Sequence, residues 1–175
     1  MKKQLIILGA GGYAKQVYWT VCRLNSHEVI GFLDETIDED KNLYDHPVRN
    51  NLESLLHLSS APIELISAVG NANLRKYWHD KFDSEFDFAT IVDPTSIVAP
   101  DAIIGKDVVI LAFTVCSCST IVGKSTNINW HCTISHDVKI GDYTNISSNV
   151  QLAGRATVGN FSQIGTGACL IPDMR

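Results

Sequence analysis

One pattern constrains the fold of this chain more than any other: an apolar residue, aliphatic at twelve of thirteen positions, recurs every six residues through its C-terminal half. The recurring positions are Val98, Ile104, Ile110, Cys116, Val122, Ile128, Ile134, Ile140, Ile146, Leu152, Val158, Ile164 and Leu170. A period of six places successive apolar residues on different faces of an α-helix, so the pattern excludes an amphipathic helix. It fits a parallel solenoid, in which each coil must stack on its neighbours to bury its apolar side.

Two further regularities define the coil. A small or apolar residue follows each aliphatic position by four, as at Ala102 and Thr114, and Gly105 and Gly123 begin a series of glycines spaced by 18. Eighteen residues are three hexads, or one turn of a triangular coil. We expect aliphatic residues in the interior, small residues at the corners and glycines where the chain turns. Because hexads of this type are associated with left-handed coils, this half is predicted to be an all-β left-handed parallel β-helix.

The N-terminal part has a different pattern, in which short apolar runs alternate with helical spacings. The expected strands are Leu5–Leu8, Glu28–Leu33, Ile63–Val69 and Phe86–Val92, and the expected helices are 13–24, 51–58 and 72–82. This alternation predicts a parallel sheet with helical crossovers. At roughly 90 residues it is about half of a dinucleotide-binding fold, an α/β Rossmann-like half domain. Because Pro94 ends the last strand, we expect this domain over residues 1–93 and the β-helix over residues 94–175.

A glycine-rich loop follows the first expected strand. The segment from Gly9 to Ala14 fits the pattern G-x-G-x-x-G/A, and helix N-terminal amides at such a loop can hold a phosphate. Asp34 ends the second strand, where an acid can bind a ribose or sugar hydroxyl. Gly70 and Asn71 follow the third strand and should border the same crevice. The alternative is a tight turn without a ligand, but this context favours a nucleotide.

A second candidate site follows from coil stacking. Residues 18 apart should lie one above another, about 4.8 Å apart. One such column is Pro100, Cys118, His136, Gly154 and Pro172. His136 lies outside the inward aliphatic set, so its side chain should point outward, and Gly154 should leave its backbone N–H open to a ligand.

An exposed imidazole beside an open amide suits acyl transfer. His136 could take a proton from an attacking amine or hydroxyl, and the Gly154 amide could hold the oxyanion that forms. Asp137 could orient the ring or raise its basicity. The alternatives are an ordinary surface histidine and, more weakly, a metal site with His131 and Cys132, for which no four-ligand spacing exists.

The whole chain resembles the sugar acetyltransferases of the sialic-acid O-acetyltransferase type, which include bacterial N-acetyltransferases of nucleotide-linked 4-amino-4,6-dideoxy sugars. The segments that carry the resemblance are Ile7 to Lys15, Ile30 to Glu35, Ala68 to Asn71 and Ile134 to Asp137. A small nucleotide-binding domain followed by a hexapeptide solenoid is highly specific to this group.

The resemblance implies a homotrimer with acetyl-CoA in the groove between neighbouring solenoids. We expect no metal, because no four-ligand spacing exists. It implies that His136, paired with Asp137, is the base and that the Gly154 amide binds the acetyl carbonyl. Asn145 stands where many members have a histidine, so we expect the auxiliary contact to the acetyl donor to differ there; a plain surface residue is the alternative. The expected nucleotide-sugar contacts are Gly9, Gly11, Gly12, Tyr13, Asp34, Glu35, Gly70 and Asn71. Relatives continue for further coils beyond the position of Arg175, so we expect a solenoid that is incomplete at its C-terminus.

Composition excludes several other classes. The net charge is −5 and the basic residues are scattered, which argues against nucleic acid as a partner. No apolar run reaches the length of a signal peptide or a membrane span. The five cysteines show no C-x-x-C spacing, as expected of reduced thiols in a cytoplasmic protein.

The function expected from these features is acetyl-CoA-dependent N-acetylation of a nucleotide-linked amino sugar for surface-polysaccharide synthesis. O-acetylation of a sialic acid or similar sugar is a second possibility. A catalytically weak nucleotide-sugar-binding module is a third. An NAD-dependent oxidoreductase is disfavoured, because only half of the dinucleotide fold is present.

Overall fold

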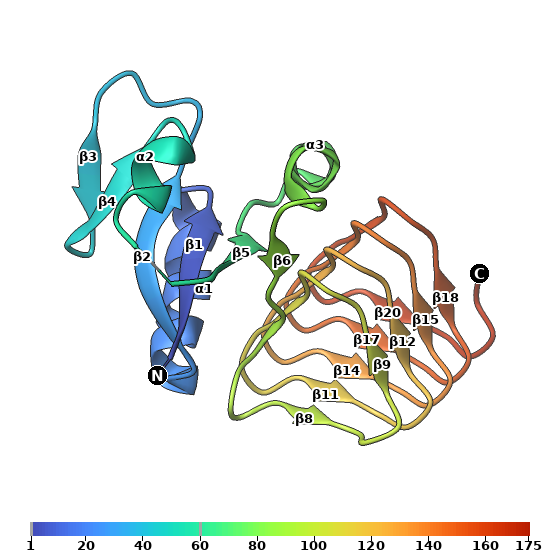
Figure 1. Ribbon diagram of the computed structural model, residues 1–175. Helices are drawn as coiled ribbons and strands as arrows, with labels where there is room; N and C mark the ends of the chain where they lie inside the picture. Colours follow the sequence, from blue (N-terminus) through green and yellow to red (C-terminus); the bar gives the residue numbers. More distant parts are fainter. Residues whose placement is uncertain (1, 60) are drawn as a thin grey trace.

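The computed structural model describes residues 2–59 and 61–175 of the chain. An N-terminal α/β domain packs against one side of a triangular solenoid, whose coils run toward the C-terminus (Figure 1). The predicted fold class, a Rossmann-like half domain followed by a left-handed β-helix, is confirmed. Within the described residues, no helix has the length and hydropathy needed to cross a bilayer.

The N-terminal domain is built on a six-stranded sheet of order β3-β4-β2-β1-β5-β6. Its strands are β1 (Lys3–Leu8), β2 (His27–Leu33), β3 (Lys41–Leu43), β4 (His46–Arg49), β5 (Ile63–Ser67) and β6 (Asp87–Phe88). Its helices are α1 (Gly12–Leu24), α2 (Glu53–Leu56) and α3 (Ala72–Phe82). Every pairing is parallel except β3 with β4, so the carboxyl ends of β1, β2 and β5 meet at one edge.

Alternate residues of the central strand bury into two separate cores, because side chains of a strand point to opposite faces. Leu5 and Ile7 pack with α1 and with the solenoid residues Val109 and Leu111. On the opposite face, the cluster containing Ile6 and Leu8 also includes α2 and α3 residues. The solenoid therefore covers part of one face of the sheet, where a full doubly wound domain would place further helices.

Two local features differ from the sequence-based prediction. The hairpin β3–β4 was not predicted, since its strands are short and polar. Its turn contains Tyr44 and Asp45, both with positive φ, as tight hairpins of this kind require. The expected strand Phe86–Val92 is two strands, because the chain passes from one sheet to another: β6 pairs with β5, and β7 (Ile91–Val92) is the first strand of the solenoid.

The solenoid has three parallel sheets, one on each face of the triangle. The first contains β7, β10 (Val109–Ile110), β13 (Asn127–Ile128), β16 (Asn145–Ile146) and β19 (Gln163–Ile164). The second contains β8 (Ile97–Val98), β11 (Val115–Cys116), β14 (Thr133–Ile134), β17 (Gln151–Leu152) and β20 (Cys169–Leu170). The third contains β9 (Ile103–Ile104), β12 (Ile121–Val122), β15 (Lys139–Ile140) and β18 (Thr157–Val158).

The hexad arithmetic predicts this packing correctly. Paired residues are 18 apart, as in Cys116 with Ile134 and Ile134 with Leu152. All the repeated aliphatic positions belong to or pack against one interior cluster. Threonines at the small position are buried, and Thr114 and Thr126 donate to carbonyl groups of the next coil.

The expectation that the spaced glycines permit the turns is wrong. The left-handed backbone conformation occurs two residues later, for example at Asp107 and Ser125, and is adopted almost throughout by residues other than glycine. Glycine is needed for close stacking instead: a Cβ on Gly123 would lie 2.6 Å from the backbone nitrogen of Asp142 in the next coil. The period of 18 therefore marks a point of coil-to-coil contact.

Candidate active site

His136 and Asp137 lie at the corner between β14 and β15. Both side chains are about half exposed. Asp137 has φ +60°, a conformation that aspartate tolerates better than most residues, and it turns the chain between two faces of the solenoid. The His136 Nδ1 and the Asp137 Oδ2 are 2.7 Å apart. With the Nδ1 proton donated to this carboxylate, Nε2 is the nitrogen free to accept a proton.

Gly154 lies directly against the His136 ring, in the next coil. The Arg155 amide donates to the His136 carbonyl at 3.0 Å, which fixes the two coils in register. A Cβ on Gly154 would lie 2.6 Å from both Cε1 and Nε2 of the imidazole, so only glycine fits beside this ring position. Within residues 2–59 and 61–175, no hydrogen bond uses the Gly154 N–H. The structure therefore brings together a basic nitrogen and an unpaired amide.

A groove of about 470 Å³ adjoins this corner. It is lined by Asp137, Lys139, Arg155, Thr157, Asp173 and Arg175. Arg155 is paired with Asp173 at 2.7 Å, and Lys139 adds a second cation on the same side of the solenoid. The groove thus presents several polar and charged groups to a ligand beside His136.

The glycine loop lies at the carboxyl edge of the sheet, as predicted. Gly9 has φ +108°, and a Cβ there would lie 2.6 Å from the Val69 side chain. A Cβ on Gly11 or Gly12 would meet nothing within 4 Å. Helix α1 begins here with no side-chain cap and no acidic residue in its first turn. Its N-terminal amides therefore face open space and suit an anionic group.

The structure also brings the other two expected contact segments to this loop. The Gly9 amide donates to the Leu33 carbonyl at 2.6 Å, which places Asp34 beside the loop. The close approach of Gly9 to Val69 places Gly70 on its other side. A Cβ on Gly70 would also meet nothing within 4 Å. Three separate segments thus converge where the sequence predicts a nucleotide crevice.

Several of the expected contact residues are engaged within the protein. The Asp34 carboxylate accepts hydrogen bonds from the Thr36 amide and hydroxyl, and the Asn71 side chain caps α3. The Glu35 carboxylate accepts from Trp78 Nε1 and Lys81 Nζ. The Tyr13 hydroxyl is buried and has no hydrogen-bond partner among the residues that the structure describes, and burial raises its pKa.

The expectation of a surface position for Asn145 is wrong. The residue is 8% exposed, because the N-terminal domain covers the solenoid face that contains β16. Its Nδ2 donates to the Gly70 carbonyl at 2.7 Å, and its Oδ1 accepts from Asn127. The sequence analysis missed Asn127 and the fully buried Arg75, which both donate hydrogen bonds to the carbonyl of Val69, the residue before Gly70. The sequence signal that could have identified Asn127 is its 18-residue spacing from Asn145, since both asparagines stand at an outward-facing position of a strand.

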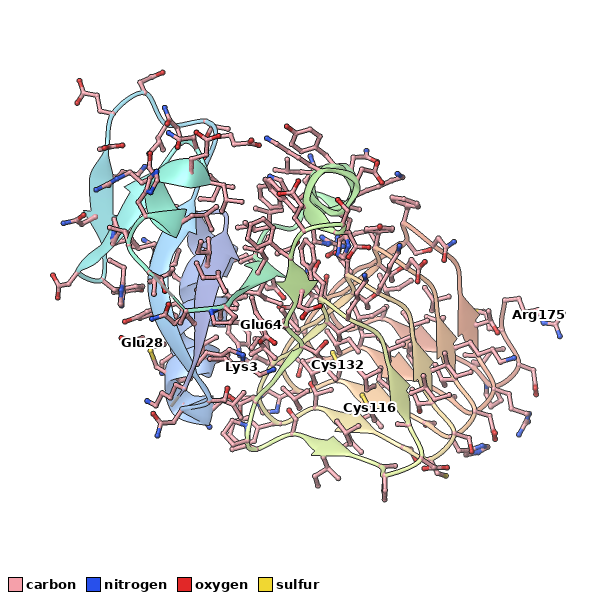
Figure 2. The ribbon with its side chains drawn as sticks, in the orientation of Figure 1. Lys3, Glu28, Glu64, Cys116, Cys132 and Arg175 are labelled. Carbon is pink, nitrogen blue, oxygen red and sulfur yellow. The ribbon has the colours of Figure 1, made fainter. Side chains whose placement is uncertain are left out.

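The weaker alternative for this corner is a metal site formed by His131, Cys132 and His136. Cys132 points into the solenoid interior, as does Cys116, and Figure 2 shows both within the coils. His131 stacks on Phe113 at a different corner from His136. These three side chains do not converge. In the part of the chain that the structure describes, no group of three or more His, Cys, Asp or Glu residues is placed to hold a metal ion.

Known proteins share both the fold and this order of domains. Residues 4–82 match the family described as the PglD N-terminal domain. The acetyltransferase domain of PglB from Neisseria gonorrhoeae, solved in complex with acetyl coenzyme A, is 28% identical with a TM-score of 0.89, and the match covers 99% of this chain and 84% of that one.

Two further structures are similar in fold. A mutant of perosamine N-acetyltransferase from Caulobacter crescentus, in complex with CoA and GDP-perosamine, has a TM-score of 0.82 at 19% identity over 98% of this chain and 90% of that one. WeeI from Acinetobacter baumannii has a TM-score of 0.71 at 16% identity, over 96% and 94%.

These findings confirm the resemblance drawn from the sequence. The fold and the order of domains are those of the class of hexapeptide-repeat acyltransferases, and this similarity indicates that the chain is an acyltransferase. Within the class, its N-terminal region is of the PglD type.

Proposed function

We propose that this protein transfers the acetyl group of acetyl-CoA to the amine of a nucleotide-linked amino sugar, for synthesis of a surface polysaccharide. The observation that carries the proposal is the contact between the His136 ring and Gly154. The glycine loop at the carboxyl edge of the sheet supplies an acceptor site of matching chemistry. The related PglB domain binds acetyl coenzyme A, and the perosamine N-acetyltransferase binds GDP-perosamine.

The geometry of the corner suggests the course of the reaction. The acceptor amine attacks the thioester carbonyl while Nε2 of His136 removes its proton. The carbonyl oxygen becomes an oxyanion, which the Gly154 N–H stabilises. Collapse of this intermediate forms the amide and breaks the C–S bond, and the imidazolium returns the proton to the CoA thiolate. Asp137 holds the ring and stabilises its charged form.

We further propose that the working unit is a homotrimer. The N-terminal domain covers the face containing β7, β10, β13, β16 and β19, whereas the turn from β14 to β15 lies at the opposite corner of the triangle (Figure 1). A sugar nucleotide on the glycine loop would thus be separated from His136 of its own chain by the solenoid. The exposed side chains of Ile97, Val115, Ile103 and Ile121 flank that corner and offer an apolar surface to a second copy.

The central experiment combines the protein with acetyl-CoA and a panel of UDP-, GDP- and dTDP-linked amino sugars and follows thiol release. We expect one of these acceptors to support turnover and His136→Ala to abolish it. His131→Ala is the control, because His131 occupies another exposed corner. Turnover by His136→Ala at the wild-type rate would contradict the assignment of the base. Mass spectrometry of the product after mild alkali distinguishes an amide, which persists, from a sugar ester, which cleaves.

Calorimetry tests the alternative of a binding module. Nucleotide-sugar binding without any binding of CoA at millimolar concentration would contradict the enzymatic proposal.

The proposed substrates also imply a cytoplasmic location, where acetyl-CoA and nucleotide sugars are made.

A complementation experiment tests whether the site is shared between copies. His136→Ala and Gly12→Phe should each be inactive. The first lacks the base, and in the second the new side chain fills the open space at the glycine loop. Co-expressed mixed trimers should regain activity, because some sites would combine an intact loop with an intact histidine. Sedimentation velocity should give three times the monomer mass of 19.2 kDa. Activity in a monomeric species would contradict the shared site.

A further inference from the structure

The turn formed by Val69 and Gly70, after β5, is held by side chains from outside the sheet. The Val69 carbonyl accepts from Arg75 Nη1 at 2.8 Å and from Asn127 Nδ2 at 3.2 Å. The Gly70 carbonyl accepts from Arg75 Nη1 at 3.1 Å and from Asn145 Nδ2 at 2.7 Å. A carbonyl oxygen has two lone pairs, so these four hydrogen bonds satisfy both carbonyls completely.

The three donor side chains are themselves fixed. Arg75 is fully buried, and its Nε donates to the Ser125 carbonyl at 3.0 Å. Asn127 and Asn145 lie on the neighbouring strands β13 and β16 and are bonded to each other at 3.0 Å. Movement of the turn would leave a buried guanidinium or amide without a partner, which is costly. The solenoid therefore holds this turn rigidly.

The orientation of these carbonyls determines where the neighbouring amides point. In a trans peptide, the C=O and N–H bonds are antiparallel. The N–H groups of Gly70 and Asn71 therefore point away from the solenoid. Among the described residues, neither group donates a hydrogen bond, and a Cβ on Gly70 would meet only open space. Two adjacent donors are thus presented beside the glycine loop.

We propose that Arg75, Asn127 and Asn145 are positioning residues, through which the solenoid sets the geometry of the acceptor site in the N-terminal domain. The ligand is the polar or anionic part of the sugar nucleotide, received by the Gly70 and Asn71 amides. The inference rests on the proposed function for the identity of that ligand. It assigns Asn145 a role in acceptor binding, in place of the expected contact to the acetyl donor.

Steady-state kinetics of the full-length protein test the proposal. Asn145→Asp keeps the shape and the acceptor for Asn127 but cannot donate to Gly70, and Asn145→Ala removes both groups. For both variants we expect the KM of the nucleotide sugar to rise about tenfold, in line with the loss of a buried hydrogen bond. The KM of acetyl-CoA should stay within about twofold of the wild-type value. A purely structural role would instead reduce the amount of active enzyme and leave both KM values unchanged.

Gln163→Ala is the matched control. Gln163 occupies the same outward column one coil later, is exposed, and donates to Ser147. This variant should leave both KM values unchanged. An equal rise in both KM values for the Asn145 variants, or no rise in either, would overturn the proposal.

A second measurement does not depend on the ligand. The ¹⁵N relaxation of the free protein should give order parameters for Gly70 and Asn71 near the rigid value of about 0.85, falling below about 0.6 in Asn145→Ala. Unchanged order parameters in Asn145→Ala would contradict the positioning role, even if the enzyme used every nucleotide sugar tested as a substrate. Failure of the wild type to turn over any nucleotide sugar, with the order parameters changed as expected, would contradict only the proposed substrate.

Discussion

At the scale of the residue, the contact between Gly154 and His136 makes a sharp prediction. In Gly154→Ala, the new methyl group would lie 2.6 Å from Nε2, so the imidazole must move off the amide. Because the proposed base would then be displaced from its catalytic position, we expect kcat/KM to fall about 10²-fold or more. The melting temperature in thermal denaturation should be nearly unchanged, since the ring lies on the surface and can move into solvent.

Gly159→Ala provides the comparison. It is also a solenoid glycine, but a Cβ there would be 3.8 Å from its nearest neighbour. Activity should remain close to that of the wild type. If Gly154→Ala were as active as Gly159→Ala, the imidazole would not need its observed position for catalysis.

Sequence arithmetic placed the residues of this corner correctly relative to one another. His136 and Gly154 are 18 apart, and a rigid coil of 18 residues leaves no freedom in how they stack. Asn145 was misplaced because the repeat fixes only whether a side chain points inward or outward. Whether an outward residue faces water or another domain depends on how the two domains dock.

At the scale of the element, the spaced glycines should be needed for coil stacking. In Gly123→Ala the Cβ would lie 2.6 Å from backbone atoms of the next coil, which cannot rotate away as a side chain could. We expect a loss of about 2–3 kcal/mol in the free energy of unfolding, typical of overpacking. Chemical denaturation measures this loss, with Gly159→Ala again as the control. Equal stability of the two variants would contradict the stacking role.

The central sheet contains an acid whose ionisation should stabilise it. Figure 2 shows Lys3 and Glu64 side by side, on β1 and β5, and His27 on β2 also contacts this carboxylate. Burial alone would raise the pKa of Glu64, but hydrogen bonds from Lys3 and His27 outweigh it and lower the pKa below the ordinary value of 4.5. The resulting stabilisation is present above that ordinary value and is lost as pH falls through the lower pKa of the folded state.

Glu64→Gln should therefore reduce the free energy of unfolding by about 1 kcal/mol at pH 7. The difference should shrink toward zero as pH falls through the folded-state pKa, because the wild-type carboxyl is then protonated as well. Urea denaturation at several pH values measures the effect. Glu28→Gln is the control, since Glu28 is exposed and its carboxylate accepts, among the described residues, only a 3.5 Å hydrogen bond from Gln4. A pH-independent difference would contradict the electrostatic explanation.

At the scale of the whole molecule, Asp107 joins the two domains. Its buried carboxylate accepts hydrogen bonds from the Ser67 amide, Ser125 Oγ and His79 Nε2, at 2.7, 2.6 and 2.9 Å. In Asp107→Asn, the amide nitrogen cannot accept, so at least one buried donor loses its partner. We expect the free energy of unfolding to fall by about 2–3 kcal/mol. In calorimetry, the N-terminal domain should then melt before the solenoid.

Asp101→Asn is the matched control, because Asp101 stands at the same hexad position and accepts from Ser119 at an exposed corner. It should change stability little. A single, unshifted transition in Asp107→Asn would contradict the role of Asp107 in docking.

The sequence by itself determined the features that depend on local periodicity. A period of six with a superperiod of 18 leaves one compact way to bury the aliphatic side chains, so the solenoid, its register and the neighbours of His136 follow from counting. The glycine loop and the crossover helices likewise follow from apolar spacing and turn residues. These features depend on contacts near in sequence or related by a fixed step.

Only the tertiary structure decided how the two domains meet. The face of the solenoid that α1 and α3 cover, the burial of Arg75 and Asn145, and the passage of the chain from β6 into β7 depend on contacts between residues at no fixed spacing. Docking is decided by the shape of two finished surfaces and by the pairing of buried polar groups, which no periodic pattern encodes. The hexad run therefore specified the corner that holds His136 and Gly154, whereas the turn at Gly70 is held by contacts at the interface between the domains.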